Sequence, residues 1–143
     1  MAELVATGLW QLLGFGKSLG AKHEQQCEAA IAAVGLQGFE HRLINTLSGG
    51  QLQRSLFARV LLQDQPVILL DEPFNAIDAK TVADLTQVIK HWHAEARTVV
   101  MVTHDLEYVR QYCPNTLLLA RECIGHGETQ KILTPENLQR AKQ

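Results

Sequence analysis

The sequence has little net charge and few cysteines, and each shortage excludes a class of protein. The 143 residues carry a formal net charge of −2, so we expect no nucleic-acid partner held by overall positive charge. The three cysteines, Cys27, Cys113 and Cys123, are scattered and lack C-x-x-C spacing. This pattern favours reduced thiols in the cytosol over a disulfide framework or a metal site.

The sequence also lacks segments that would carry it into or through a membrane. The amino terminus has no basic region typical of a signal peptide. The longest apolar stretch, residues 4–16, is interrupted by Gln11 and is shorter than the roughly 20 residues that a membrane-spanning helix needs. We therefore expect membrane association only through a partner protein.

The residues that are present predict a globular α/β fold. The composition, 46% hydrophobic and 20% charged, is typical of a packed domain. Apolar runs at Val67–Leu70 and Thr98–Thr103 predict strands, and the unbroken first run is typical of a strand buried on both faces of a parallel sheet. Two further strands, Thr116–Ala120 and Cys123–His126, are expected to pair around a turn at residues 121–122.

Helices are predicted before, between and after these strands. Apolar spacing, Asp78 as a cap and Gly35 as a stop support helices at Leu4–Leu13, Ala21–Val34, Gln51–Leu62, Ala79–Ala96, Leu106–Tyr112 and from Thr134 to about Ala141. On the third of these, Arg54 and Arg59 supply charge. The order predicts a helical subdomain over residues 1–46, followed in residues 47–143 by part of a nucleotide-binding parallel sheet.

A glycine-rich segment near the amino terminus resembles the tail of a phosphate-binding P-loop. Residues 14–18 read G-F-G-K-S, but the first glycine of that motif would fall at Gln11. A P-loop also follows a buried strand and opens a helix, whereas Gly20 follows here at once. A loop that ends a helix is the favoured interpretation.

The stretch from Leu47 to Asp78 combines three elements suited to phosphate chemistry. Ser48, Gly49 and Gly50 form a turn into a helix, whose unpaired amides and partial positive charge favour a phosphate. The alternative is that Ser48 is only a helix cap. A short polar turn, residues 75–78, ends the stretch.

The third element is a pair of acids at the end of the first strand. Asp71 is suited to hold Mg²⁺, directly or through water, and Glu72 to orient or deprotonate an attacking water. The alternative is a surface cap on the strand. His104, after the second strand, would lie at the same edge of a parallel sheet and suits contact with a γ-phosphate, although an isolated histidine there is more often structural.

Four motifs in this order and spacing resemble the ATPase subunits of ABC transporters. They are L-S-G-G-Q at Leu47–Gln51, V-I-L-L-D-E-P at Val67–Pro73, N-A-I-D at Asn75–Asp78 and V-T-H-D at Val102–Asp105. The resemblance implies the carboxyl-terminal part of a P-loop NTPase sheet behind a helical signature subdomain. It also implies ATP and Mg²⁺ as cofactors.

The resemblance also implies a role for each motif. The signature motif contacts ATP that is bound mainly by the opposite subunit of a head-to-tail dimer. The residues implied to make this contact are Ser48, Gly49, Gly50 and Gln51. Asp78 belongs to the D-loop, which communicates across that dimer. Asp71 is the Mg²⁺ aspartate, acting through water, and the catalytic residues are Glu72 as general base and His104 as the switch histidine. Asn75, in place of the usual serine, and Leu52, in place of a frequent basic residue, depart from the pattern.

A finer resemblance, to importers of zinc, manganese and iron-type metals, lies near the carboxyl terminus. It is carried by residues 122–127, E-C-I-G-H-G, by residues 133–138, L-T-P-E-N-L, and by Phe74. It implies an ATP-hydrolysing subunit for metal-ion import, cytoplasmic and peripheral on the inner face of the membrane, and bound to a transmembrane permease. No nucleic-acid partner is expected.

Three motifs of the family have no counterpart in the sequence: the P-loop, the A-loop aromatic residue and the Q-loop glutamine, all upstream of the helical subdomain. We therefore expect a truncated chain that alone hydrolyses ATP negligibly and tends to associate. The alternative is a non-catalytic remnant or interaction module that docks on a full ATPase subunit or a permease. A soluble ABC-type ATPase acting on DNA or ribosomes is disfavoured by the compact spacing and acidic balance.

His91 and His93 invite a metal-sensing interpretation because the resemblance is to metal importers. Side chains two positions apart on a helix point in different directions. Two exposed histidines without a metal are therefore the favoured interpretation.

Overall fold

The structure is a computed structural model that describes residues 1–10, 20–75 and 77–142. It is a mixed α/β fold with a small parallel sheet, which confirms the expected class in outline. The chain divides into two compact units, Met1–Val102 and Thr103–Gln143. The P-loop-like residues 14–18, and the end of the helix predicted at Leu4–Leu13, lie outside the described residues.

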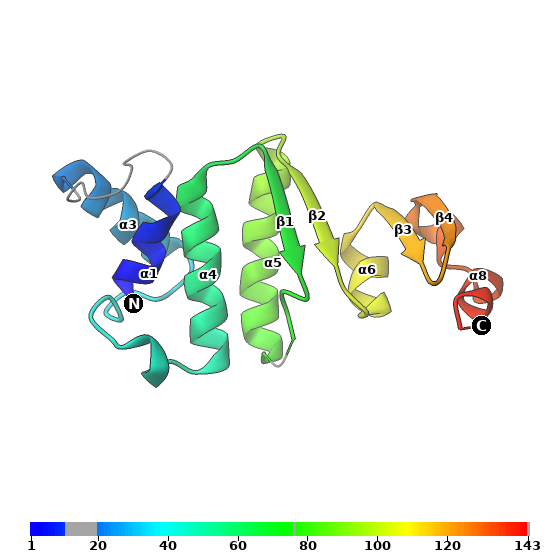
Figure 1. The fold of residues 1–143 in the computed structure, drawn as a ribbon, viewed down its shortest axis with the longest axis horizontal. Coiled ribbons are helices and arrows are strands. Elements are labelled where there is room, and N and C mark those ends of the chain that lie inside the picture. The colour runs from blue at the N-terminus through cyan, green and yellow to red at the C-terminus, as the bar shows by residue number, and fades with distance from the viewer. Residues whose placement is uncertain (11–19, 76, 143) are drawn as a thin grey trace. The chain divides into compact units, whose positions relative to one another are not determined.

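The first unit opens with the helical part of the chain (Figure 1). Its helices are α1 (Ala2–Ala6), the 3-10 turn η1 (Thr7–Leu9), α3 (Ala21–Ala33), the 3-10 turn η2 (Ile44–Thr46), α4 (Gly49–Gln63) and α5 (Ala79–Ala94). The predicted stop of α3 at Gly35 is confirmed. Gly35 has a φ of +70°, and the Leu36 N–H donates to the Ile31 carbonyl at 3.0 Å. This is the left-handed ending that glycine makes easy.

A two-stranded parallel sheet follows in the same unit. Strand β1 (Val67–Asp71) pairs with β2 (Thr98–Val102), in a register that runs from Val67 beside Thr98 to Asp71 beside Val102. The predicted parallel pairing is thus confirmed. The Glu72 N–H donates to the Val102 carbonyl at 2.9 Å and continues the pairing one residue beyond β1.

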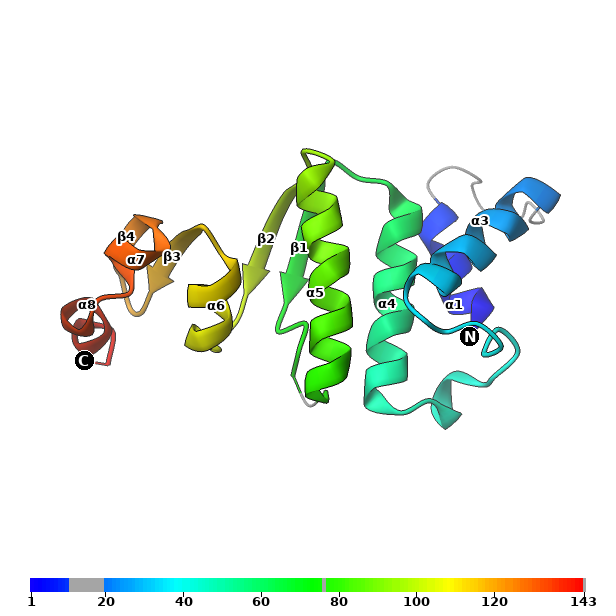
Figure 2. The same cartoon turned by 180° about the vertical axis from the view of Figure 1, so that it is seen from behind.

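The expectation that β1 is buried on both faces is wrong. Ile68 and Leu70 are 4% and 8% exposed and belong to the core, but Val67 and Leu69 are 54% and 74% exposed. The same alternation runs along β2, where Val100 and Val102 are exposed. The reason is that α5 covers one face of the sheet (Figures 1 and 2), so only side chains on that face enter the core.

The core of the first unit extends from α1 and α3 across α4 to α5 and the covered face of the sheet. The Phe57 ring of α4 stacks on Trp92 of α5, with ring centroids 5.6 Å apart and an interplanar angle of 9°. Both side chains are buried, as is Leu85. The apolar spacing that predicted this helix is therefore confirmed, since Leu85 and Trp92 lie in the core and Val88 and Ile89 pack against it.

The second unit is a small hairpin with short helices. It contains α6 (Leu106–Tyr112), the antiparallel strands β3 (Asn115–Leu119) and β4 (Cys123–Glu128), and helices α7 (Thr129–Ile132) and α8 (Pro135–Arg140). The Thr129 hydroxyl donates to the Cys113 carbonyl at 2.5 Å, which joins α7 to the carboxyl-terminal end of α6. The predicted strand pair and the Thr134 cap of the last helix are confirmed.

The part of the chain that the structure describes contains neither a membrane-spanning helix nor a metal-binding cluster. No helix there combines the length and apolar character needed to cross a bilayer. No three His, Cys, Asp or Glu side chains come together there as a group that could hold a metal ion. His91 Nε2 lies 3.3 Å from Oε1 of Glu95, the residue that caps the end of α5.

Candidate functional site

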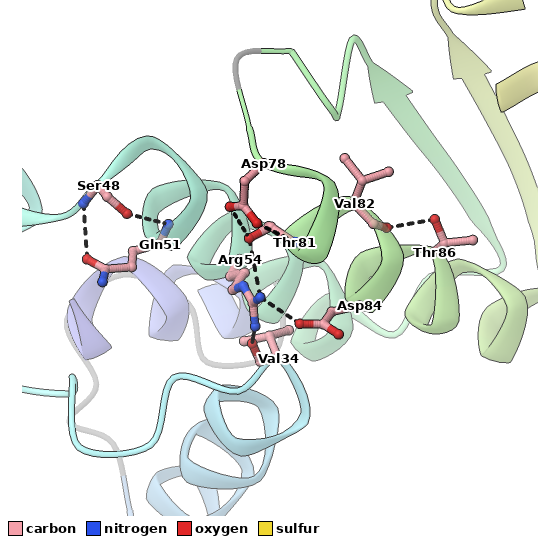
Figure 3. A network of polar contacts seen from close by, with 9 residues as sticks. All are labelled: Val34, Ser48, Gln51, Arg54, Asp78, Thr81, Val82, Asp84 and Thr86. Atoms are coloured by element: carbon pink, nitrogen blue, oxygen red, sulfur yellow. Dashed lines mark hydrogen bonds and ion pairs between the residues drawn. The ribbon is translucent and has the colours of Figure 1, made fainter. Parts of the chain in front are cut away.

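The Ser48-Gly49-Gly50 turn forms the amino-terminal end of α4 through a reciprocal cap. The Gln51 N–H donates to Ser48 Oγ at 3.2 Å, and the Ser48 N–H donates to Gln51 Oε1 at 3.0 Å (Figure 3). Ser48 is thus a helix cap, as the alternative interpretation held, and Gln51 completes the capping box. Amides in the first turn of a helix lack partners within the helix, so Gly49 and Gly50 keep the character suited to an anion.

Gly50 brings this turn against the amino-terminal end of α5. A Cβ built on Gly50 would lie 3.3 Å from Thr81 Oγ1 and 3.5 Å from Asp78 Oδ2. A larger residue would therefore press on the polar groups that begin α5. Two segments that are distant in sequence, the Ser48–Gly50 turn and the polar turn that ends at Asp78, are thus neighbours in the structure.

Asp78 caps α5 with both carboxylate oxygens. The Thr81 N–H donates to Oδ1 at 3.0 Å and the Thr81 hydroxyl donates to Oδ2 at 2.7 Å. The Thr81 hydroxyl, and after it the Thr81 amide, lowers the pKa of Asp78 below its ordinary value. The carboxylate is consequently held ionised, exposed to solvent and fixed in direction.

Arg54 connects both helix ends and was missed as a site residue in the sequence. Its Nη2 donates to Asp84 Oδ2 at 2.7 Å and to Thr81 Oγ1 at 3.3 Å, and its Nη1 donates to the Val34 carbonyl at 3.1 Å (Figure 3). The sequence indicated only a charge on the helix, because the acceptors lie 20 to 30 positions away. The one feature of the sequence that could have indicated its role at the site is its place one helical turn after Gly50.

The two adjacent acids lie at the carboxyl-terminal end of β1. Asp71 is exposed and shares the uncovered face of the sheet with Leu69. Glu72 is half-buried and has a φ of +43°, a left-handed conformation that is uncommon for glutamate. This φ ends the extended backbone of β1 immediately after Asp71. An exposed carboxylate with free access to water fits a hydrated Mg²⁺.

His104 belongs to the second unit and is exposed. It precedes Asp105, whose carboxylate caps α6 by accepting the Tyr108 N–H at 2.9 Å. The place of His104 beside Glu72 and the nucleotide stays a prediction from the sequence.

Comparisons with known proteins point to one family. A sequence model of the ABC transporter family matches residues 3–75. The chain is 34% identical to the manganese transport system ATP-binding protein MntA of Synechocystis, over 96% of this chain and 53% of that protein. It is 35% identical to the zinc transport system ATP-binding protein TroB of Treponema pallidum, over 97% of this chain and 52% of that protein.

The comparison of structures agrees. A chain in a metal-chelate type ABC transporter, described in an inward-facing conformation, superposes with a TM-score of 0.90 at 30% identity. The match covers 99% of this chain and 57% of that one. The chain thus spans about half the length of the curated relatives and of the solved structure that it matches.

Proposed function

Because the chain belongs to the ABC transporter family, we propose that it acts as an ATP-binding and ATP-hydrolysing component of a membrane transporter. Its partners are a second ATPase subunit in a head-to-tail dimer and a transmembrane permease. It works on the cytoplasmic side, held at the membrane by the permease.

The observation that carries the proposal is the meeting of the signature turn and Asp78. Gly50 lies against the Asp78–Thr81 cap, so the amino-terminal end of α4 and the ionised carboxylate that begins α5 are neighbours. Helix amides at Gly49 and Gly50 suit the phosphates of a nucleotide. Because Leu47–Gln51 match the signature motif of the family, we assign this surface to ATP that is held mainly by the second subunit.

The acids at the end of β1 complete the assignment. Asp71 would hold Mg²⁺ through water, and Glu72 would take a proton from the water that attacks the γ-phosphate, with His104 contacting that phosphate. Mg²⁺ neutralises charge that develops on the transferred phosphoryl group. Without a nucleotide fixed beside it, Glu72 loses its contribution as a general base, roughly 10²- to 10⁴-fold in rate.

Metal-ion import is the transport function that we propose. The sequence motifs at residues 122–127 and 133–138 support it, and so do relatives named as manganese and zinc transport ATP-binding proteins. The permease selects the cargo, so the proposal concerns the class of transporter. When the chain is mixed with a homologous full-length ATPase subunit, a metal-importer permease in vesicles should stimulate the hydrolysis that the mixture shows, whereas a permease of another class should not.

A mixing experiment tests the ATPase proposal. The purified chain alone should show negligible ATP hydrolysis. Mixed with a homologous full-length ATPase subunit whose own signature turn is inactivated, it should restore hydrolysis, and Ser48→Arg should abolish the restoration. Turnover by the chain alone that Glu72→Gln removes would contradict the account, as would restoration by the Ser48→Arg variant.

A second function, a non-catalytic docking module, is favoured by the uncovered sheet face. Val67, Leu69, Val100 and Val102 are between 48% and 74% exposed on adjacent strands. Such an apolar patch is typical of a surface that another protein covers. If the chain binds a full ATPase subunit equally well with and without ATP, and if the Ser48→Arg variant still binds, the docking function replaces the first proposal.

A further inference from the structure

We propose that Arg54 is a positioning residue that locks the amino-terminal end of α4 to that of α5. In this role it holds the Ser48–Gln51 turn and the Asp78 carboxylate in one fixed relative position. The structural part of the proposal concerns this chain alone. Its consequence for catalysis rests on the proposed function.

The guanidinium group reaches three segments of the first unit with two nitrogens. Nη1 donates to the Val34 carbonyl at the end of α3, at 3.1 Å. Nη2 donates to Thr81 Oγ1 at 3.3 Å and to Asp84 Oδ2 at 2.7 Å, in the first and second turns of α5 (Figure 3). A planar, charged fork suits such a set of acceptors, whereas a single ammonium group does not.

Thr81 passes the restraint on to Asp78. Its hydroxyl accepts from Arg54 and donates to Asp78 Oδ2 at 2.7 Å, while its amide donates to Asp78 Oδ1 at 3.0 Å. The same hydroxyl is the atom nearest to a Cβ built on Gly50. A shift of Thr81 would therefore change the position of the D-loop carboxylate and the packing against the signature turn.

Gly35 makes room for the guanidinium. A Cβ on Gly35 would lie 3.0 Å from Arg54 Nη1, and the residue has a φ of +70°. Its lack of a side chain thus serves the left-handed end of α3 and the approach of Arg54 at once.

Burial separates this contact from an ordinary surface ion pair. The Arg54 side chain is 16% exposed and that of Asp84 is 49% exposed. An exposed pair alone contributes little to stability. The covered arginine with several bonded acceptors is held in one orientation, so its main effect is on geometry.

Amide hydrogen exchange on the 143-residue chain tests the lock directly. In Arg54→Ala, the amides of Gln51 and Thr81 should lose protection together, by about tenfold, as expected for loss of hydrogen bonds to a charged group. Arg54→Lys keeps the charge and much of the volume, and should show the same joint loss to a smaller degree. Lys22→Ala, which removes an exposed cation on α3, is the matched control and should change neither amide.

Amides within β1 show whether the fold is intact in each variant. Protection at Gln51 and Thr81 that stays at the wild-type level in Arg54→Lys and in a folded Arg54→Ala would overturn the lock. If Arg54→Ala loses protection throughout the first unit, that variant has lost its fold, and the test then rests on Arg54→Lys. Joint loss at the two helix ends alone supports the lock, and loss at only one of them refutes it.

The mixing assay gives the catalytic readout. With the inactivated homologous subunit, Arg54→Lys should lower kcat about tenfold and leave KM for ATP near the wild-type value, because the misplaced turn fails mainly in the transition state. An unchanged kcat alongside restored wild-type hydrolysis would refute the catalytic consequence of the lock. No restoration by the wild-type chain would refute the proposed function, while the exchange result stands by itself.

Discussion

The amino-terminal ends of α4 and α5 differ sharply from the β1–β2 sheet in the same unit. At the helix ends, Ser48, Arg54 and Asp78 are bonded to groups within the chain. On the sheet, one face enters the core, whereas the other presents Leu69 at 74% exposure beside the carboxylate of Asp71. The helix ends thus form a polar surface whose side chains are hydrogen-bonded within the chain, whereas this face of the sheet is apolar and, among the described residues, exposed.

This difference indicates two kinds of partner contact. A fixed polar surface at helix amides suits a small anionic ligand. An apolar sheet face suits a protein surface or protein segment. The nucleotide and the protein partners are thus expected to engage different sides of the first unit.

The two faces of the sheet should respond very differently to the same substitution. Leu70→Ala opens a cavity in the core and should lower the free energy of unfolding by about 3 kcal/mol. Leu69→Ala, at the next position on the uncovered face, should change it by less than about 0.5 kcal/mol. Urea denaturation of both variants measures the difference. A cost for Leu69→Ala that matches that of Leu70→Ala would mean that the second face is also packed.

Charge on the uncovered face should abolish self-association. We expect the wild-type chain to form oligomers as its concentration rises, and Leu69→Lys combined with Val100→Lys to keep it monomeric, since lysine blocks association of exposed strands. Sedimentation velocity over a range of concentrations measures this. As a control, Leu117→Lys introduces the same charge at another exposed leucine, in the second unit. The prediction fails if the double variant associates as strongly as the wild type.

The left-handed backbone at Glu72 should make the folded chain less stable than a variant with glycine at this position. Glu72→Gly should raise the free energy of unfolding by about 1 kcal/mol, since glycine adopts a φ of +43° without strain. Glu72→Gln keeps the strain and serves as the control with the same loss of charge. Thermal and urea unfolding compare the two variants. Equal stabilities would show that the conformation carries no strain.

Among these residues, Asp78 should make the smallest contribution to the stability of the fold, and this contribution should depend on pH. Its folded pKa is lowered, so its ionised form adds stability that is complete above the ordinary carboxyl pKa of about 3.9. That stability is lost as the pH falls through the lowered value. The melting temperature of the wild type should therefore exceed that of the isosteric Asp78→Asn at neutral pH, and the difference should vanish in acid. A difference that is constant with pH would assign the effect to shape alone.

The sequence predicted the elements well where their signals are local. Gly35, Asp78 and Thr134 mark helix ends through their own conformational or capping chemistry, and each prediction is confirmed. Parallel pairing followed from two apolar runs separated by a helix.

What the sequence missed depends on contacts between distant positions. The apolar run at β1 gave no sign that only one face is covered, because coverage is decided by α5 and not by the strand itself. From the sequence, Arg54 was interpreted only as a charge on its helix, because its partners Val34 and Asp84 are distant in the chain. The left-handed Glu72 also had no signal, since glutamate rarely adopts that conformation.

The most direct test of the central claim is ATP-dependent binding of the chain to a homologous full-length ATPase subunit. The account predicts that sedimentation detects the complex with ATP and Mg²⁺ but not without nucleotide. It also predicts that Ser48→Arg, which blocks the turn, abolishes the complex, whereas Ser48→Ala, which removes the hydroxyl and leaves the Gly49 and Gly50 amides accessible, weakens it without abolishing it. Equal binding without ATP, or an ATP-dependent complex that survives Ser48→Arg, would contradict the claim that the signature turn faces a nucleotide held by the second subunit.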